Sequence, residues 1–555
     1  MASSKYTELM FVPQFSPDAT KRNRELEIAK QKSHAAKVAH QKRKQKQETP
    51  ASGRHPAFLP YPPENQPDED YPLNLLRRRQ PKITSQTLLD ILPGGHSDPF
   101  NAQALPISPR VNQLITFIRD AYLPGVYITS FMKIKEPVRG APMCTTIAEG
   151  FHVTGRRTAA RVWESMKEEL SDEGRALAWV SSYIPVLAKY SPEDTARDLN
   201  LMAIKMRAQS LRILKDRIAN LSTEAQPNIS LVSQIVSLFR ASCKENDIAS
   251  AKIHAEIIRH LIDRVEQPDR HIQVLFTTVM NNDTEVAVSH MRNTIFDFEG
   301  WVRQQLNKLW VDKAETNMPL VSEEYRDLHP CIQLPATRDA CIRLRRYLLT
   351  RQTLVNLNDP QDLDRTDAVF TVFTQDSLYD SGVLINVYIN LVAGKVYQMK
   401  AAFRHMEASI ALTTLHVLRR GVFEATIYGG DHRIRYHVTT ITHLEGTMRT
   451  MLKLASPEDL AQYGAAILWI FFYGARFEWR INKRSLDQGL KPEKTWFTEM
   501  FARQARELKI TQWNDAREAL SKFVFYEFLE PNLPAWYEET LSAGKEGITT
   551  AHQVW

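Results

Sequence analysis

The chain has 555 residues, with 71 Lys and Arg against 64 Asp and Glu, a net charge of +7 and a pI near 9.0. This length is enough for two to four domains of about 100 to 200 residues each. A hydrophobic content of 43% excludes a chain that is disordered throughout, and only 20 Gly residues disfavour a turn-rich all-β protein.

The positive charge is concentrated in a basic N-terminal segment, residues 1–48. Residues 19–47 contain ten Lys and Arg residues and only two acidic residues, which gives this stretch a net charge of +8. The rest of the chain therefore has a net charge of −1. Ser16-Pro17-Asp18 is a helix-start signal, and we expect a disordered or conditionally helical segment that orders on a partner. The residues expected to contact import machinery or nucleic acid are Lys21, Arg22, Arg24, Lys37, Lys42, Arg43, Lys44 and Lys46.

Three interpretations of this segment remain open. It is a nuclear-import signal centred on residues 42–46, an electrostatic contact to phosphates, or a solvated charge run without a partner. A leucine zipper is excluded, because the chain continues into Thr49-Pro50 and then Gly53 instead of apolar heptads.

Residues 49–105 are predicted to form a Pro-rich linker, since twelve of the 29 prolines lie between Pro50 and Pro109. The cluster Arg77-Arg78-Arg79 within it is interpreted as a solvated turn, with a second basic determinant as the alternative.

From residue 106 to 555 the pattern predicts a mainly α protein, a large multi-helix body. Ile248, Ala251, Ala255, Ile258 and Ile262 lie on one face of a helix, with Ile253, Ile257 and Leu261 beside it suggesting cover on more than one side. Similar stripes run from Ala176 to Leu187, where Pro185 should kink or end the helix, and from Trp513 to Phe523, with Pro531 as the stop.

Two helix-start signals have the same form, Ser191-Pro192-Glu193-Asp194 and Ser456-Pro457-Glu458-Asp459. Residues 317–337 are the least regular part of the body and either separate two helical lobes or form a long surface loop. The best strand signal, residues 424–428, is short and weak.

The longest uncharged apolar stretch, residues 460–475, is shorter than the roughly 18 to 20 residues that span a bilayer. We therefore expect a buried core helix and no membrane partner. The start of the chain lacks the apolar region of a secretory signal, which favours an intracellular protein.

No sequence motif for catalysis or metal binding is found. Phosphate-binding Gly loops, a nucleophile elbow and H-E-x-x-H are absent, so we expect no enzyme, no cofactor and no metal site. The spacing of His416, His432, His437 and His443 favours structural roles. Cys144, Cys243, Cys331 and Cys341 occur singly and are interpreted as small buried residues.

Three groups of residues carry a resemblance to a known family. The first is Phe11-Val12 followed by the basic run through His34, and the second is Gly95-His96-Ser97 with Asp98, Pro99 and Phe100. The third is the helix with Ala251 and His254. Together they resemble the fungal-specific transcription-factor-like proteins, some labelled "tachykinin family". These carry the helical regulatory region of the binuclear zinc cluster regulators, and the zinc cluster itself is absent here.

The resemblance implies a nuclear transcriptional regulator whose helical body binds other regulatory proteins or an effector. The basic segment would direct nuclear entry and contact DNA without strong sequence preference. The alternative is a helical scaffold that does not bind DNA.

Overall fold

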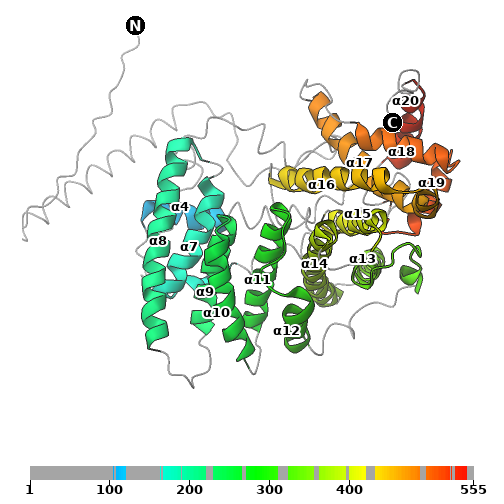
Figure 1. Ribbon diagram of the computed structural model, residues 1–555. Helices are drawn as coiled ribbons and strands as arrows, with labels where there is room; N and C mark the ends of the chain where they lie inside the picture. The colour runs from blue at the N-terminus through cyan, green and yellow to red at the C-terminus, as the bar shows by residue number, and fades with distance from the viewer. Residues whose placement is uncertain are drawn as a thin grey trace, which may run out of the picture. The chain divides into compact units, whose positions relative to one another are not determined.

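Residues 104, 108–119, 163, 167–188, 191–220, 229–265, 270–310, 323–354, 362–394, 399–419, 432–487, 495–525, 527 and 532–546 are described by the computed structural model. These residues are helical over most of their length and contain no strand, which confirms the mainly α prediction (Figure 1). All of them belong to one unit, Asp70–Trp555. The weak strand signal at 424–428 lies outside the described residues.

The helices are α4 (Pro109–Phe117), α7 (Glu173–Ala188), α8 (Glu193–Ala219), α9 (Ile229–Lys244), α10 (Ile248–Asp263), α11 (Arg270–Ser289), α12 (Arg303–Leu309), α13 (Pro335–Leu354), α14 (Asp362–Ala393), α15 (Ala401–Leu418), α16 (His432–Leu454), α17 (Pro457–Asp487), α18 (Trp496–Glu507), α19 (Trp513–Ser521) and α20 (Leu533–Glu546). A π-helical turn, Phe298–Val302, precedes α12, and a 3-10 turn spans Glu323–Arg326.

Helices that follow one another in the chain mostly pack side by side. Helix α7 packs on α4, α8 and α9, and α9 packs on α10 and α11 (Figure 1). Helix α11 then contacts α14, which lies against α13 and α15, and α17 lies against α15, α18 and α19. Short connections between antiparallel neighbours account for this order.

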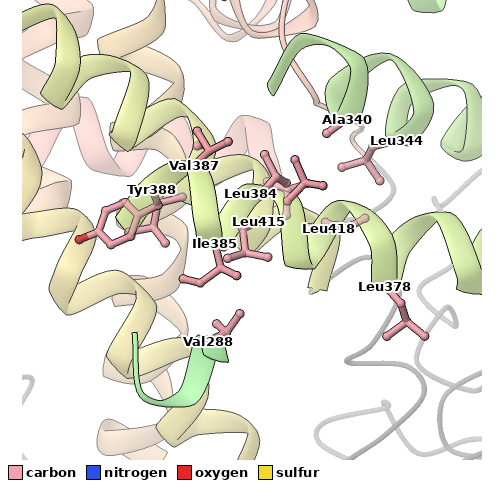
Figure 2. Close-up of a cluster of buried hydrophobic side chains, with 14 of the residues drawn as sticks. Val288, Ala340, Leu344, Leu378, Leu384, Ile385, Val387, Tyr388, Leu415 and Leu418 are labelled. Atoms are coloured by element: carbon pink, nitrogen blue, oxygen red, sulfur yellow. The ribbon is translucent and has the colours of Figure 1, made fainter. Parts of the chain in front are cut away.

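The apolar faces of these helices form two clusters of buried side chains. The smaller one joins α4, α7 and α8, with Val111, Trp179 and Leu199 among its members. The larger one extends from α9 to α20. Its members include Val288 of α11, Leu344 of α13, Leu384 of α14 and Leu415 of α15, and Figure 2 shows Leu384 and Leu415 lying between the other two.

The apolar stretch at residues 460–475 lies within α17, and most of its side chains, Trp469 and Phe472 among them, are buried in the larger cluster. This confirms the expected core helix. Among the described helices, none has the length and apolar character that a bilayer crossing requires.

The described part of the irregular stretch 317–337 is not wholly exposed. Leu328, Cys331, Ile332 and Leu334 are buried in the larger cluster. The segment between the 3-10 turn and α13 therefore packs into the core along part of its length.

Two helix-level expectations are refined by the structure. Helix α7 does not end at Pro185 but continues to Ala188, and Ile184 and Leu187 on either side of the proline are buried. Helix α10 matches the expected stripe, and beside it Leu261 is buried and Ile257 packs against the larger cluster. Ile253 is 59% exposed, so the expected cover does not extend to this residue.

Candidate interaction surface

Helix α8 is a 27-residue helix with two apolar faces. Its inner face contributes Leu199 and Ala203 to the smaller core cluster and Leu214 to the larger one. At about 1.5 Å per residue the helix is roughly 40 Å long. The outer face of α8 is therefore long, and the packing of the inner face into the core holds the helix in place.

Polar contacts hold α8 on α7 and α9. Arg217 donates to Asp172 Oδ2 at 2.6 Å and to Gln234 Oε1 at 2.8 Å, and Ser210 Oγ donates to the carbonyl of Gly174 at 2.8 Å. Burial raises the pKa of Asp172, but hydrogen bonds from Arg217 and from the Arg175 backbone N–H outweigh this effect and leave the pKa below its usual value. Asp172 is therefore ionised at neutral pH and pairs with Arg217.

The outer face carries large apolar side chains that are exposed and that no other described residue buries. Leu201 is 50% exposed, Ile204 58%, Leu211 39% and Ile218 43%. They follow one another three, seven and seven residues apart, which is the a and d spacing of a heptad pattern, with Ala208 and Lys215 at the intervening positions. The row extends over about 26 Å.

Basic side chains accompany this row. Lys205 and Arg212 are exposed along one edge, and Asp216 is the one acidic residue between Leu201 and Ile218. Arg207, on the other edge, is turned towards Glu245 at the end of α9 and forms a bidentate ion pair with it. We call the row Leu201, Ile204, Ala208, Leu211, Lys215 and Ile218, with Lys205 and Arg212, the α8 surface.

Scattered single apolar residues are normal on protein surfaces, whereas a row of them with a regular period is typical of a binding site. The α8 surface is not among the sites predicted from the sequence. The signal was present in the heptad spacing, but the second apolar set on the inner face of the same helix obscured it.

The residues predicted to contact nucleic acid or import machinery lie outside the described residues. They are Lys21, Arg22, Arg24, Lys37, Lys42, Arg43, Lys44 and Lys46. The same is true of the first two groups of family-motif residues, Phe11, Val12, His34, Asp98, Pro99 and Phe100.

The third motif group lies in α10 and faces inward. Ala251 is fully buried and His254 is 7% exposed, and burial lowers the pKa of His254. Asp247 caps this helix by accepting from the backbone N–H of Ser250 at 3.1 Å. Ala251 and His254 thus pack α10 against the core and do not form part of an exposed surface.

One cluster contains Ser, Glu and His side chains together. The Ser233 hydroxyl donates to Glu169 Oε2, and His271 Nε2 lies 3.6 Å from Glu169 Oε1. A serine nucleophile needs its hydroxyl bonded to the imidazole, with the carboxylate behind it. Here the carboxylate lies between the other two, so the cluster has the wrong order for activating Ser233.

The described cysteines are core residues. Cys243, Cys331 and Cys341 are free and buried, as predicted, and Cys144 lies outside the described residues. Burial raises the pKa of the Cys331 and Cys341 thiols to about 12 and that of Cys243 also above its usual value. Such thiols are poor nucleophiles. Within the described ranges, no three His, Cys, Asp or Glu side chains converge as metal ligands would.

The described histidines of the predicted structural set fit that interpretation. His416 is buried and packs edge-on against Tyr473, and His443 lies 3.4 Å from the Tyr388 hydroxyl.

Two buried carboxyl groups have unusual surroundings. Glu407 is fully buried and accepts from the backbone N–H of Gln333 at 3.0 Å through Oε1. Its Oε2 makes no hydrogen bond of good geometry with another described residue, although the backbone N–H of Leu334 also favours the charged carboxylate. Asp283 accepts from the backbone N–H groups of Ile295 and Phe296. Burial raises the pKa of each carboxyl to about 7. Both join helices to loops and are enclosed by the core.

A scan against protein-family models gives no match, and searches of the curated proteins and of the solved structures give none either.

Proposed function

We propose that this protein is a nuclear transcriptional regulator whose helical body binds another regulatory protein through the α8 surface. The observation that carries the protein-binding part is the exposed heptad row Leu201, Ile204, Leu211 and Ile218 on a helix fixed by its inner face. The resemblance of the sequence motifs to the fungal-specific transcription-factor-like proteins supports the regulatory part. The proposal includes no enzymatic activity.

The basic segment supplies nuclear import and a contact to DNA phosphates. Its excess of eight positive charges supports up to about eight phosphate contacts, so binding to DNA should weaken steeply as salt rises. Binding that is insensitive to salt would contradict the phosphate contact.

A fluorescent fusion with and without residues 1–48 tests the import role. We expect the intact fusion in the nucleus and the truncated one in the cytoplasm. Chromatin occupancy mapping of the tagged protein then tests the regulatory role. Cytoplasmic residence of the intact fusion, or no enrichment at any genomic site, contradicts the proposed function.

A helical scaffold without DNA binding is the second candidate. It is favoured by the charge balance, because the chain outside residues 19–47 sums to −1 and has no net attraction to nucleic acid. Nuclear or cytoplasmic residence without chromatin enrichment, together with intact partner binding, is the outcome expected for the scaffold.

A further inference from the structure

We infer that the α8 surface binds an acidic amphipathic helix of a partner protein. This inference rests on the proposed function, in which the helical body binds a regulatory protein, and it specifies the chemistry of that partner.

The shape of the surface fits a helix. Leu201 and Ile204, then Leu211 and Ile218, occupy a and d positions over about 26 Å, the length of some 17 helical residues. A second helix with apolar residues at the same spacing inserts its side chains between them, as in a two-helix seam. The contacts of Arg217 and Ser210 to neighbouring helices keep the surface in place before binding.

The charges of the surface select the partner. Lys205 and Arg212 line one edge and Lys215 lies within the row, while Asp216 is the one carboxylate between Leu201 and Ile218, so these exposed side chains remain net basic. A partner helix with Glu or Asp beside its apolar row places opposite charges against these three residues. A basic partner helix places like charges there and is excluded by repulsion.

The same charges disfavour a second copy of this chain. Two α8 surfaces in contact would bring Lys205, Arg212 and Lys215 of both copies into one seam, with only Asp216 of each copy to offset them. A lipid surface is disfavoured by composition, because the row has no aromatic residue and helices that lie in a membrane interface carry Trp, Phe and Leu over a broad face.

The test uses the full-length protein and designed helical peptides labelled for fluorescence anisotropy. One peptide has Leu at its a and d positions and Glu at its flanking positions, the second has Lys at those flanking positions, and the third is a scrambled form of the first. We expect the Glu peptide to bind at least roughly tenfold more tightly than either of the others. The scrambled peptide has the same net charge as the Glu peptide, so its binding measures non-specific attraction of an acidic peptide to the basic N-terminal segment.

Two sets of variants locate the binding. Ile204→Ser with Leu211→Ser should weaken binding of the Glu peptide about tenfold or more. The matched control, Ile253→Ser, removes an equally exposed Ile from α10 and should leave binding unchanged. Lys205→Glu with Arg212→Glu should invert the preference towards the Lys peptide, a result that simple misfolding cannot produce.

Several outcomes overturn the inference. These are equal binding of the Glu and scrambled peptides, an unchanged preference after the charge reversal, self-association in sedimentation that the Ser variant abolishes, and binding to phosphatidylserine vesicles that the Ser variant abolishes. The fluorescent fusion and occupancy experiments do not depend on the peptides. Failure of the peptides alone therefore rejects the partner chemistry, and failure of the fusion alone rejects the nuclear function.

Discussion

The Glu478 carboxylate of α17 accepts a hydrogen bond of 2.9 Å from the backbone N–H of Phe497, in the first turn of α18. Its second oxygen accepts from the backbone N–H and the hydroxyl of Thr498, at 2.9 and 2.8 Å. The first N–H groups of a helix have no partner within it, so α17 supplies the cap that α18 lacks in its own sequence.

Replacing this cap should destabilise the end of the chain. We expect Glu478→Ala to lower the free energy of unfolding by about 1–3 kcal/mol, because it leaves two buried N–H groups unpaired. Glu478→Gln keeps one carbonyl oxygen and should lose less. Hydrogen exchange of the Phe497 and Thr498 amides, read alongside urea unfolding, checks this. Unchanged exchange at these two amides in Glu478→Ala would show that the carboxylate is not the cap.

Two helical glycines should respond in opposite directions to the same substitution. A Cβ at Gly446 of α16 meets nothing within 4 Å, so Gly446→Ala should stabilise the protein by about 0.5–1 kcal/mol through its helix propensity. A Cβ at Gly474 of α17 would overlap the ring of Phe497, so Gly474→Ala should destabilise by about 1–3 kcal/mol. Thermal unfolding of both variants measures the difference. Equal effects would mean that Phe497 does not pack against α17 at Gly474.

Glu407 makes stability depend on pH. Its pKa is about 7 in the folded chain against 4.5 for an ordinary Glu, so between these values the folded state binds more protons than the unfolded state. The free energy of unfolding therefore falls as pH rises from about 4.5 to about 7. Replacing the Glu407 carboxyl with a group that does not ionise should remove this decrease in the free energy of unfolding.

We expect Glu407→Gln to be more stable than the parent by about 2–3 kcal/mol at pH 8 and close to it at pH 4.5. Comparing the two proteins at each pH cancels contributions from other carboxyls. Asp283→Asn is the control. Because both of its oxygens accept from backbone N–H groups, we expect this variant to be destabilised at pH 4.5, and less so at pH 8, where the raised pKa of Asp283 already costs the parent stability. A Glu407→Gln difference that is independent of pH contradicts the prediction.

The partly exposed Arg343 of α13 forms an ion pair with the buried Asp380 of α14. Arg343 Nε lies 3.1 Å from each carboxylate oxygen, and Asp380 is 2% exposed. Arg343→Met leaves the carboxylate without this partner and should cost about 1–3 kcal/mol at pH 8, less than for a fully buried pair because Arg343 is partly exposed to solvent. Burial already raises the pKa of Asp380, and loss of Arg343 raises it further. In the Arg343→Met variant, the Asp380 carboxyl will therefore be protonated and neutral at mildly acidic pH.

We therefore expect the defect of Arg343→Met to shrink at pH 5, where a protonated Asp380 no longer needs the guanidinium. Chemical denaturation at the two pH values measures this. The double variant Arg343→Met with Asp380→Asn should recover part of the loss at pH 8. A defect of equal size at both pH values would indicate lost packing of the Arg343 side chain in place of an unpaired charge.

Helices with a single apolar stripe, and helix starts that carry a local N-cap signal, could be predicted from the sequence. The start of α17 is one success, since Ser456 Oγ accepts from the Asp459 backbone N–H and Asp459 Oδ2 accepts in return from that of Ser456. The matching signal before α8 predicts the helix but not its cap. The Ser191 hydroxyl donates to the Leu187 carbonyl at the end of α7 instead.

The stripe from Trp513 to Phe523 was predicted as one helix, which is wrong in extent. Helix α19 ends at Ser521, and Phe523 and Val524 belong to a buried turn. The Val524 carbonyl accepts from Trp469 Nε1 at 3.1 Å and from the Tyr473 hydroxyl at 2.9 Å. These bonds come from another helix, so local periodicity could not reveal them. The hydrogen bond of Glu407 with the Gln333 backbone and the ion pair of Asp380 with Arg343 also join residues far apart in the sequence, so local periodicity could not predict them.

The reactivity of the three thiols buried in the core can report local opening of the protein around each of them. Cys243 lies in α9, Cys341 in α13 and Cys331 in the loop before α13. None of them can react with an alkylating reagent until its surroundings separate, because each is buried and protonated. The order in which these three positions become alkylated will therefore rank the regions around them by how often they open.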